Sequence, residues 1–147
     1  MQNKLSGKKF INLLRFPMFM LLTEKSHIEQ TLALYRNVLG EDIASSTHFG
    51  ILDNEILKAA GSVKCYSGHW YLRCCVVKPE YRGYGLQREL IKERLEYLAK
   101  KTDVARVSVY PGNNYSLKNI ELEGFEFEKE KKLQTGKTVR VYKKELK

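Results

Sequence analysis

The feature that most constrains the fold is a change of hydrophobic period that occurs twice between residues 69 and 111. Residues 69–77 form a run of β-branched, aromatic and cysteine residues that is typical of a strand. Residues 86–101 place leucine and isoleucine on one stripe at helical spacing, and residues 104–111 return to a β-branched pattern. A strand, a helix and a strand in this order form a parallel pair with a right-handed crossover. The sequence therefore predicts a sheet that contains a parallel pair.

The chain on both sides of this unit predicts further strands and helices. Residues 26–40 carry an approximate apolar face at helical spacing, with Ser26 as the N-cap and Gly40 as the stop. Residues 47–77 read as strands separated by Asp-Asn and Ser-Gly pairs, which suit the turns of tight hairpins. A short helix ends before Gly124, and two more strands follow it.

These elements predict an α/β (α+β) fold with a mixed, mostly antiparallel central sheet and flanking helices. Residues 8–15 are the candidate first strand, although the N-terminal third has the weakest pattern. The length of 147 residues suits one domain, so we expect a single domain over residues 1–147.

Charge and composition limit the classes of partner. The net charge is +9, and residues 61–147 hold nineteen of the 26 Lys and Arg against eleven of the 17 Asp and Glu. This bias favours a polyanionic ligand, or it serves solubility alone. The most apolar stretch, residues 10–22, contains Arg15 and Pro17 and is shorter than the roughly 20 residues that span a bilayer. We therefore expect a soluble cytoplasmic protein with no membrane partner. The three cysteines include no C-x-x-C pair, and no metal site is predicted.

The loop between the strand and the helix has the composition of a phosphate socket. Pro79 cannot donate to a strand ladder, so it ends the strand. Gly83 and Gly85 allow tight backbone turns and a close approach of a ligand. The helix that begins at Leu86 presents unpaired N–H groups and the positive end of its dipole. With Arg82 as a nearby fixed charge, the loop predicts a site for a phosphate or diphosphate.

Two common phosphate loops do not fit this stretch. A dinucleotide fingerprint needs a third glycine, but Gly83-Tyr84-Gly85 is followed by Leu86, Gln87 and Arg88. A P-loop needs Gly-Lys-Ser/Thr, which does not follow either.

The stretch resembles motif A of the GNAT superfamily, the acyl-CoA-dependent N-acyltransferases. That motif reads Arg/Gln-x-x-Gly-x-Gly/Ala after a strand that ends in Val-x-Pro. Here Val77-Lys78-Pro79 precedes Arg82-Gly83-Tyr84-Gly85-Leu86-Gln87, and only Gln87 departs from the pattern. Downstream, Asn113, Ser116, Gly124 and Phe125 match the family's next helix and its Gly-Phe end. The resemblance is strongest over residues 46–127.

The resemblance implies a splayed parallel pair formed by the fourth and fifth strands, with acetyl-CoA as the co-substrate. Its pantetheine arm would lie along the fourth strand, and its diphosphate on the N–H groups of the loop. Arg88 or Lys118 would bind the adenosine 3′-phosphate. The implied cofactor-binding residues are Cys75, Val76, Val77, Arg82, Gly83, Tyr84, Gly85, Leu86, Gln87, Arg88, Asn113 and Ser116.

The catalytic groups depart from the familiar pattern. Where many members of the family place a tyrosine acid this chain has Ile120, and where some place a glutamate base it has Tyr71. The candidate catalytic residues are therefore Ser116, Tyr115 and Tyr71, because each carries a hydroxyl that can exchange a proton. His69 is a further candidate base, although it lies beside a turn.

The resemblance implies an N-acetyltransferase that moves an acetyl group from acetyl-CoA to a primary amine of a small molecule or peptide. A homodimer is compatible with it. The alternative is a non-catalytic module that binds acyl-CoA or RNA on the same fold, and acyl-CoA hydrolysis is a third reading. No arginine-rich arm or RNP-like signature is present, which argues against a nucleic-acid partner.

Overall fold

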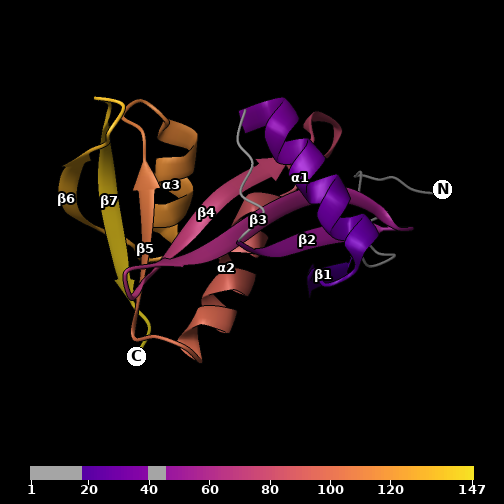
Figure 1. The fold of residues 1–147 in the computed structure, drawn as a ribbon, viewed down its shortest axis with the longest axis horizontal. Helices are drawn as coiled ribbons and strands as arrows, with labels where there is room; N and C mark the ends of the chain where they lie inside the picture. Colours follow the sequence, from indigo (N-terminus) through magenta and orange to yellow (C-terminus); the bar gives the residue numbers. More distant parts are fainter. Residues whose placement is uncertain (1–17, 40–45) are drawn as a thin grey trace.

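The computed structural model describes residues 18–39 and 46–147, and Figure 1 shows how their elements are arranged. The strands are β1 (Met18–Leu21), β2 (Thr47–Asp53), β3 (Ile56–Tyr66), β4 (His69–Val77), β5 (Val104–Val109), β6 (Glu126–Lys132) and β7 (Thr138–Glu145). The helices are α1 (Lys25–Leu39), the short 3₁₀ helix η2 (Pro79–Tyr81), α2 (Leu86–Ala99) and α3 (Asn114–Leu122). The predicted strand–helix–strand unit is therefore present.

Within this described part of the chain, the strands form one mixed sheet in the order β1-β2-β3-β4-β5-β7-β6. Every neighbouring pair is antiparallel except β4 and β5, which run parallel because α2 crosses over between them. The predicted mixed, mostly antiparallel sheet with one parallel pair is thus confirmed.

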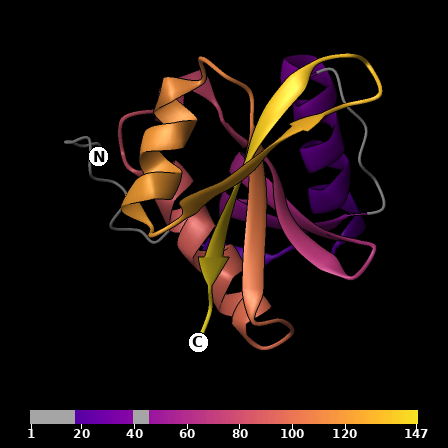
Figure 2. The ribbon, with the colours of Figure 1, turned by 90° about the vertical axis from the view of Figure 1, so that its left-hand side faces the viewer.

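The helices cover the two faces of the sheet, as Figure 2 shows with the sheet between α1 and the other two helices. On one face α1 packs through Tyr35 onto a core cluster that contains Leu57 and Val76. On the other face α2 and α3 pack onto a larger cluster that contains Leu72 and Ile120. No helix in residues 18–39 and 46–147 is both long enough and apolar enough to cross a membrane.

The parallel pair is short, and this opens the sheet. Residues Trp70, Tyr71 and Leu72 pair with Ala105, Arg106 and Val107, but both strands continue beyond that point without pairing to each other. Beside the end of the ladder, Cys74 has a φ of 51° and forms a bulge, where the register of β3 against β4 shifts. A bulge bends the strand that carries it. The predicted splay between the fourth and fifth strands is therefore present.

Three details differ from the sequence prediction or lie beyond it. The candidate strand at residues 8–15 lies outside the described residues, and the described first strand is β1. Helix α1 begins at Lys25, and the backbone N–H of Ile28 donates to the carbonyl of Glu24. Ser26 is therefore inside the helix and is not its N-cap. The first hairpin turns at Asn54 and Glu55, one residue later than predicted.

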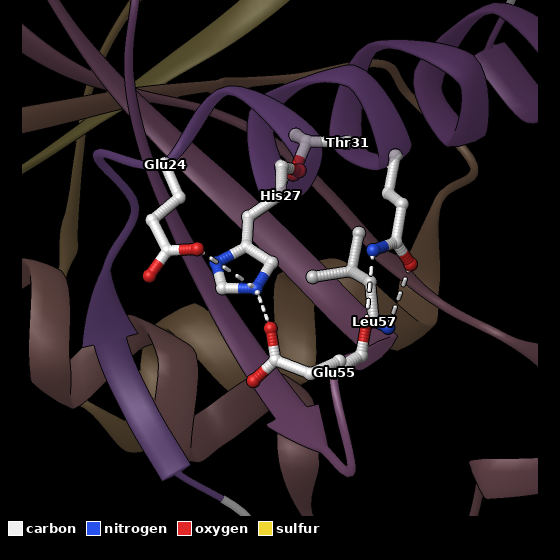
Figure 3. Close-up of polar contacts among 6 residues, drawn as sticks. Glu24, His27, Thr31, Glu55 and Leu57 are labelled. Carbon is white, nitrogen blue, oxygen red and sulfur yellow. Dashed lines mark hydrogen bonds and ion pairs between the residues drawn. The ribbon is translucent and has the colours of Figure 1, made fainter.

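Side chains of α1 hold this hairpin turn in place (Figure 3). Nε2 of the buried His27 lies 2.8 Å from Oε1 of Glu55, and Gln30 bonds both the carbonyl of Glu55 and the N–H of Leu57. Glu24, His27 and Glu55 also offer ligand atoms within 4.8 Å of one another, a spacing that a metal ion could use. Both glutamates are exposed, and the contact between His27 and Glu55 by itself explains why the residues meet. The contacts fix the position of α1 over the sheet.

Candidate active site

A cleft with a volume of about 750 Å³ passes through the sheet where β4 and β5 separate. Its walls come from both strands, from helices α2 and α3, and from the β3–β4 and β6–β7 hairpins. Its polar and charged lining residues include Tyr66, His69, Tyr71, Arg73, Cys75, Gln87, Arg94, Asn113, Ser116, Lys129 and Lys131.

One end of the cleft leads to the predicted phosphate socket. Gly83 and Gly85 have φ angles of 90° and 76°, and a Cβ built on either would meet nothing within 4 Å. Gly85 is the N-cap of α2 and supplies no side-chain cap. The first N–H groups of α2 therefore have no side-chain cap at Gly85, and they can donate to an anion. The Arg82 side chain is anchored nearby, because its Nε donates to the carbonyl of Val77 over 3.0 Å.

Polar side chains join α2 to α3 beside this socket. Asn113 caps α3 by accepting a bond from the N–H of Ser116 over 3.3 Å. Gln87 is buried, with its Nε2 3.4 Å from Oγ of Ser116 and its Oε1 3.0 Å from Nδ2 of Asn119. The residue that departs from motif A thus directs its side chain toward α3, and its backbone N–H stays at the start of α2.

The bulge in β4 is held by a buried arginine. Arg94 on α2 is 2% exposed, and its Nη1 donates to the carbonyls of Ser62, Arg73 and Cys74 over 3.1–3.4 Å. Its Nε donates to the carbonyl of Leu90 over 3.0 Å. Because carbonyl oxygens compensate the desolvated charge, the guanidinium can stay buried beside the cleft. It also opposes the effect of desolvation, which raises the pKa of the Cys75 thiol.

Aromatic and basic side chains gather at the other end of the cleft. Tyr66 and Tyr71 meet edge to face with ring centroids 5.8 Å apart, and Arg73 donates to the hydroxyl of Tyr66. Arg106, which pairs with Tyr71 across the strands, binds both oxygens of Glu128 over 2.9 and 3.2 Å. This ion pair holds the pKa of the Glu128 carboxyl below its usual value and raises that of Arg106.

The predicted catalytic residues occupy different places. Tyr71 and Ser116 both line the cleft, but they come from its opposite ends. Tyr115 does not line it and is 64% exposed at the start of α3.

Four of the predicted cofactor-binding residues line the cleft, and the others lie at the end of β4 and between Arg82 and Arg88. Cys75, Gln87, Asn113 and Ser116 line the cleft, and the loop of residues 82–86 continues from it. Arg88 is already engaged, because its Nη2 lies 2.5 Å from Oε2 of Glu123.

Sequence reasoning missed Arg94 as a residue of the site. A signal was present, because Arg94 lies four residues from both Leu90 and Leu98 and therefore falls on the apolar stripe of α2. A charged residue at such a position has to find polar partners inside the fold. Nothing in the sequence indicated that these partners would be carbonyls at a bulge.

Known structures of low sequence identity share this fold. The ribosomal-protein-S18-alanine N-acetyltransferase of Escherichia coli is 16% identical, with a TM-score of 0.71 over 88% of this chain and 94% of that one. A chain of the NatC complex bound to Gag peptide and CoA is 14% identical, with a TM-score of 0.74 over 88% and 98%. Arabidopsis thaliana NAA60 in complex with acetyl-CoA is 13% identical, with a TM-score of 0.72 over 87% and 97%.

No curated protein sequence matches the chain. The family model described as Acetyltransferase (GNAT) family, however, matches residues 10–125, which is most of the sequence. The match includes the motif A loop and the start of α3, the two segments on which the resemblance was based. The chain therefore belongs to the GNAT family of acetyltransferases, whose co-substrate is acetyl-CoA, as motif A predicted.

Proposed function

We propose that this protein transfers the acetyl group of acetyl-CoA to a primary amine of a small molecule or peptide. The observation that carries the proposal is the cleft between β4 and β5, which is lined by Gln87 directly after the uncapped N-terminus of α2. An uncapped helix start suits a diphosphate, and unpaired strand edges suit an extended amide chain that bonds like a strand. CoA has both parts, in that order. A peptide acceptor is supported by two proteins of the same fold, the ribosomal-protein-S18-alanine N-acetyltransferase and the NatC complex bound to Gag peptide.

In the proposed reaction, a neutral amine nitrogen attacks the thioester carbonyl, a C–N bond forms, the C–S bond breaks, and CoA leaves as the thiol. Backbone N–H groups near Val76 and Val77, on the β4 edge that faces the wedge, would stabilise negative charge on the carbonyl oxygen. Tyr71 would relay the amine proton: its hydroxyl oxygen accepts that proton, directly or through a water molecule, while its own hydroxyl proton passes to solvent. Ser116, whose hydroxyl lies beside Gln87 at the start of α2, would supply a proton to the leaving sulfur.

The socket would be formed by residues 82–88, with Asn113 beside the pantetheine arm. Of these residues, Gly85 gives the sharpest test. Its φ of 76° excludes most side chains, but asparagine and aspartate tolerate this region better than others. Gly85→Asp would place a carboxylate where the diphosphate is expected, and Gly85→Asn has nearly the same shape without the charge.

The experiment measures acetyl-CoA binding by titration calorimetry and thiol release with a panel of amines. We expect wild type to bind acetyl-CoA and to release CoA only when an amine is present. Gly85→Asp should lose binding, and Gly85→Asn should keep most of it. Equal affinity in Gly85→Asp and wild type would place the diphosphate elsewhere.

Binding without turnover on any amine would favour the alternative, a non-catalytic acyl-CoA-binding module. The buried Ile120, at a position where many relatives place an acid, is the observation that makes this alternative worth testing. A titration with RNA at two salt concentrations tests the RNA-binding form of that alternative. We also propose a cytoplasmic location, because the three cysteines are free thiols, as a reducing compartment favours.

A further inference from the structure

We propose that the acceptor is an amine that carries a carboxylate or phosphate a few atoms from the nitrogen that becomes acetylated. This inference rests on the proposed function, because it concerns the end of the cleft that the donor leaves open. It names a class of substrate that neither the family nor the fold specifies.

The cleft has two chemically different ends. Gln87, Asn113 and Ser116, from the starts of α2 and α3, form the donor end. The opposite end is formed by Tyr66 and His69 of the β3–β4 hairpin, by Tyr71 and Arg73 of β4, and by Lys129 and Lys131 of β6. An acceptor must reach the thioester from this second end, because the donor fills the first.

The side chains of the second end share the face of the sheet that carries α1. Tyr71 and Arg73 alternate along β4 with Leu72, whose side chain lies in the core cluster under α2 and α3. On β6, Lys129 and Lys131 pair with Val141 and Val139 of β7. In β7 these two valines alternate with Tyr142, which again belongs to the core of the other face.

The charged side chains that line the cleft are positive. Among the described residues that line it, four are cations, Arg73, Arg94, Lys129 and Lys131, and none is an aspartate or glutamate. The nearby carboxylate of Glu128 does not change this balance, because Arg106 neutralises it. Lys129 and Lys131 are exposed and form no ion pair with any residue of the ranges 18–39 and 46–147. The two lysines are therefore available to an anionic ligand.

This charge pattern selects among acceptors in two ways. A polycationic amine would be repelled by the lysines, whereas a carboxylate or phosphate would be attracted and held near the wedge. Nearby cations also lower the pKa of a bound amine, so a larger fraction of it is in the neutral form that can attack. The lower amine pKa would assist the reaction here, because no aspartate or glutamate of the described residues lines the cleft to serve as the base.

The test compares acceptors that differ mainly in charge, in a thiol-release assay at low salt. One arm uses the peptides Ser-Asp-Gly-Gly, Ser-Asn-Gly-Gly and Ser-Lys-Gly-Gly, and a second arm uses the α-amides of aspartate and asparagine, which differ only in the side-chain carboxylate. We expect kcat/KM to be at least tenfold higher for the acidic member in one arm or both, and the arm that responds identifies a peptide or a small molecule. The preference should shrink as ionic strength rises.

Variants then locate the effect. The double variant Lys129→Gln/Lys131→Gln should reduce the preference to less than threefold and leave the affinity for acetyl-CoA unchanged. Lys92→Gln, an exposed lysine on α2 that does not line the cleft, is the matched control and should keep the full preference.

The outcomes separate the two proposals. If acetyl-CoA is neither bound nor consumed, the proposed function fails. If acetyl-CoA is bound but the acidic, amide and lysine acceptors react equally, or if no acidic acceptor reacts, the inference is overturned and donor binding stands. A preference that the double variant retains would also overturn it, because other groups would then be responsible.

Discussion

The guanidinium of Arg94 lies directly against Gly61, so that a methyl group on Gly61 would come within 2.8 Å of the arginine Cζ. Helix α2 and strand β3 approach this closely because residue 61 has no side chain. Gly61 also pairs with Cys75 next to the register shift of the β3–β4 ladder. One contact therefore links the packing of the helix to the bulge that opens the cleft.

Gly61→Ala should destabilise the protein by about 1–3 kcal/mol, the usual cost of overpacking a well-filled site. Arg94 cannot easily move away, because four hydrogen bonds hold its guanidinium in place. Urea denaturation measures the change in the free energy of unfolding. In the Arg94→Ala background the same substitution should cost much less, and an equal cost in both backgrounds would show that the two residues are not coupled.

Tyr71→Phe should lower kcat by about 10²- to 10⁴-fold, the range expected when a general acid or base is lost. The affinity for acetyl-CoA should stay the same, because Tyr71 lies at the acceptor end. Steady-state kinetics with a saturating amine measures the effect. Tyr97→Phe removes a hydroxyl from a tyrosine that packs on Phe49 and does not line the cleft, so it should leave kcat unchanged.

Measuring kcat for Ser116→Ala and Tyr115→Phe in the same assay ranks the other two candidates for proton transfer. A larger loss in either of them than in Tyr71→Phe would move the proton-transfer role to α3.

Arg88→Gln should weaken acetyl-CoA binding by about ten- to a hundredfold if this arginine binds the adenosine 3′-phosphate, because a hydrogen bond to a charged group is worth roughly 1.5–3 kcal/mol. Its ion pair with Glu123 orients the guanidinium but leaves it partly exposed. Calorimetry with acetyl-CoA and with its 3′-dephospho analogue separates this role from a structural one. Wild type and variant should bind the analogue equally, and Lys118→Gln in parallel tests the other predicted cation.

Stability should fall as the pH drops from 7.5 to 5.5, in part because of His48. Burial lowers the pKa of His48, whose Nδ1 lies 2.7 Å from Oγ of Ser62. In the unfolded chain the pKa of this histidine is about 6.5, so below that pH the unfolded chain binds a proton at His48 that the folded protein does not bind. The free energy of unfolding therefore decreases as the pH falls.

His48→Gln removes this titration, so the variant should lose less stability than wild type between the two pH values. Urea denaturation at both values measures the difference. An equal loss in wild type and variant would exclude His48 as a contributor.

The sequence predicted those parts of the fold that depend on local pattern. The bounds of β4 and the start of α2 follow from the β-branched run, Pro79 and Gly85, each of which acts on the backbone within a few residues. The tight backbone turns at Gly83 and Gly85 were predictable for the same reason. The N-cap of α1 was placed two residues late, at Ser26, because serine is a good cap but the first bond of the helix goes to the carbonyl of Glu24.

The other end of the cleft could not be predicted, because it depends on contacts between distant segments. Tyr66, Arg73 and Lys131 line one cleft only after three hairpins and a crossover have formed. The bulge at Cys74 depends on Arg94, which is twenty residues away and on another element. No local pattern encodes such a contact.

The short ladder between β4 and β5 also has a mechanical consequence. In the described part of the chain, three residue pairs are the only direct strand pairing between β1–β4 and β5–β7. If the molecule were pulled at its two ends, the β4–β5 ladder should break first, because few hydrogen bonds oppose the force there. A bound pantetheine arm would add hydrogen bonds where β4 and β5 separate, so the force needed to pull the two strands apart should rise when acetyl-CoA is present.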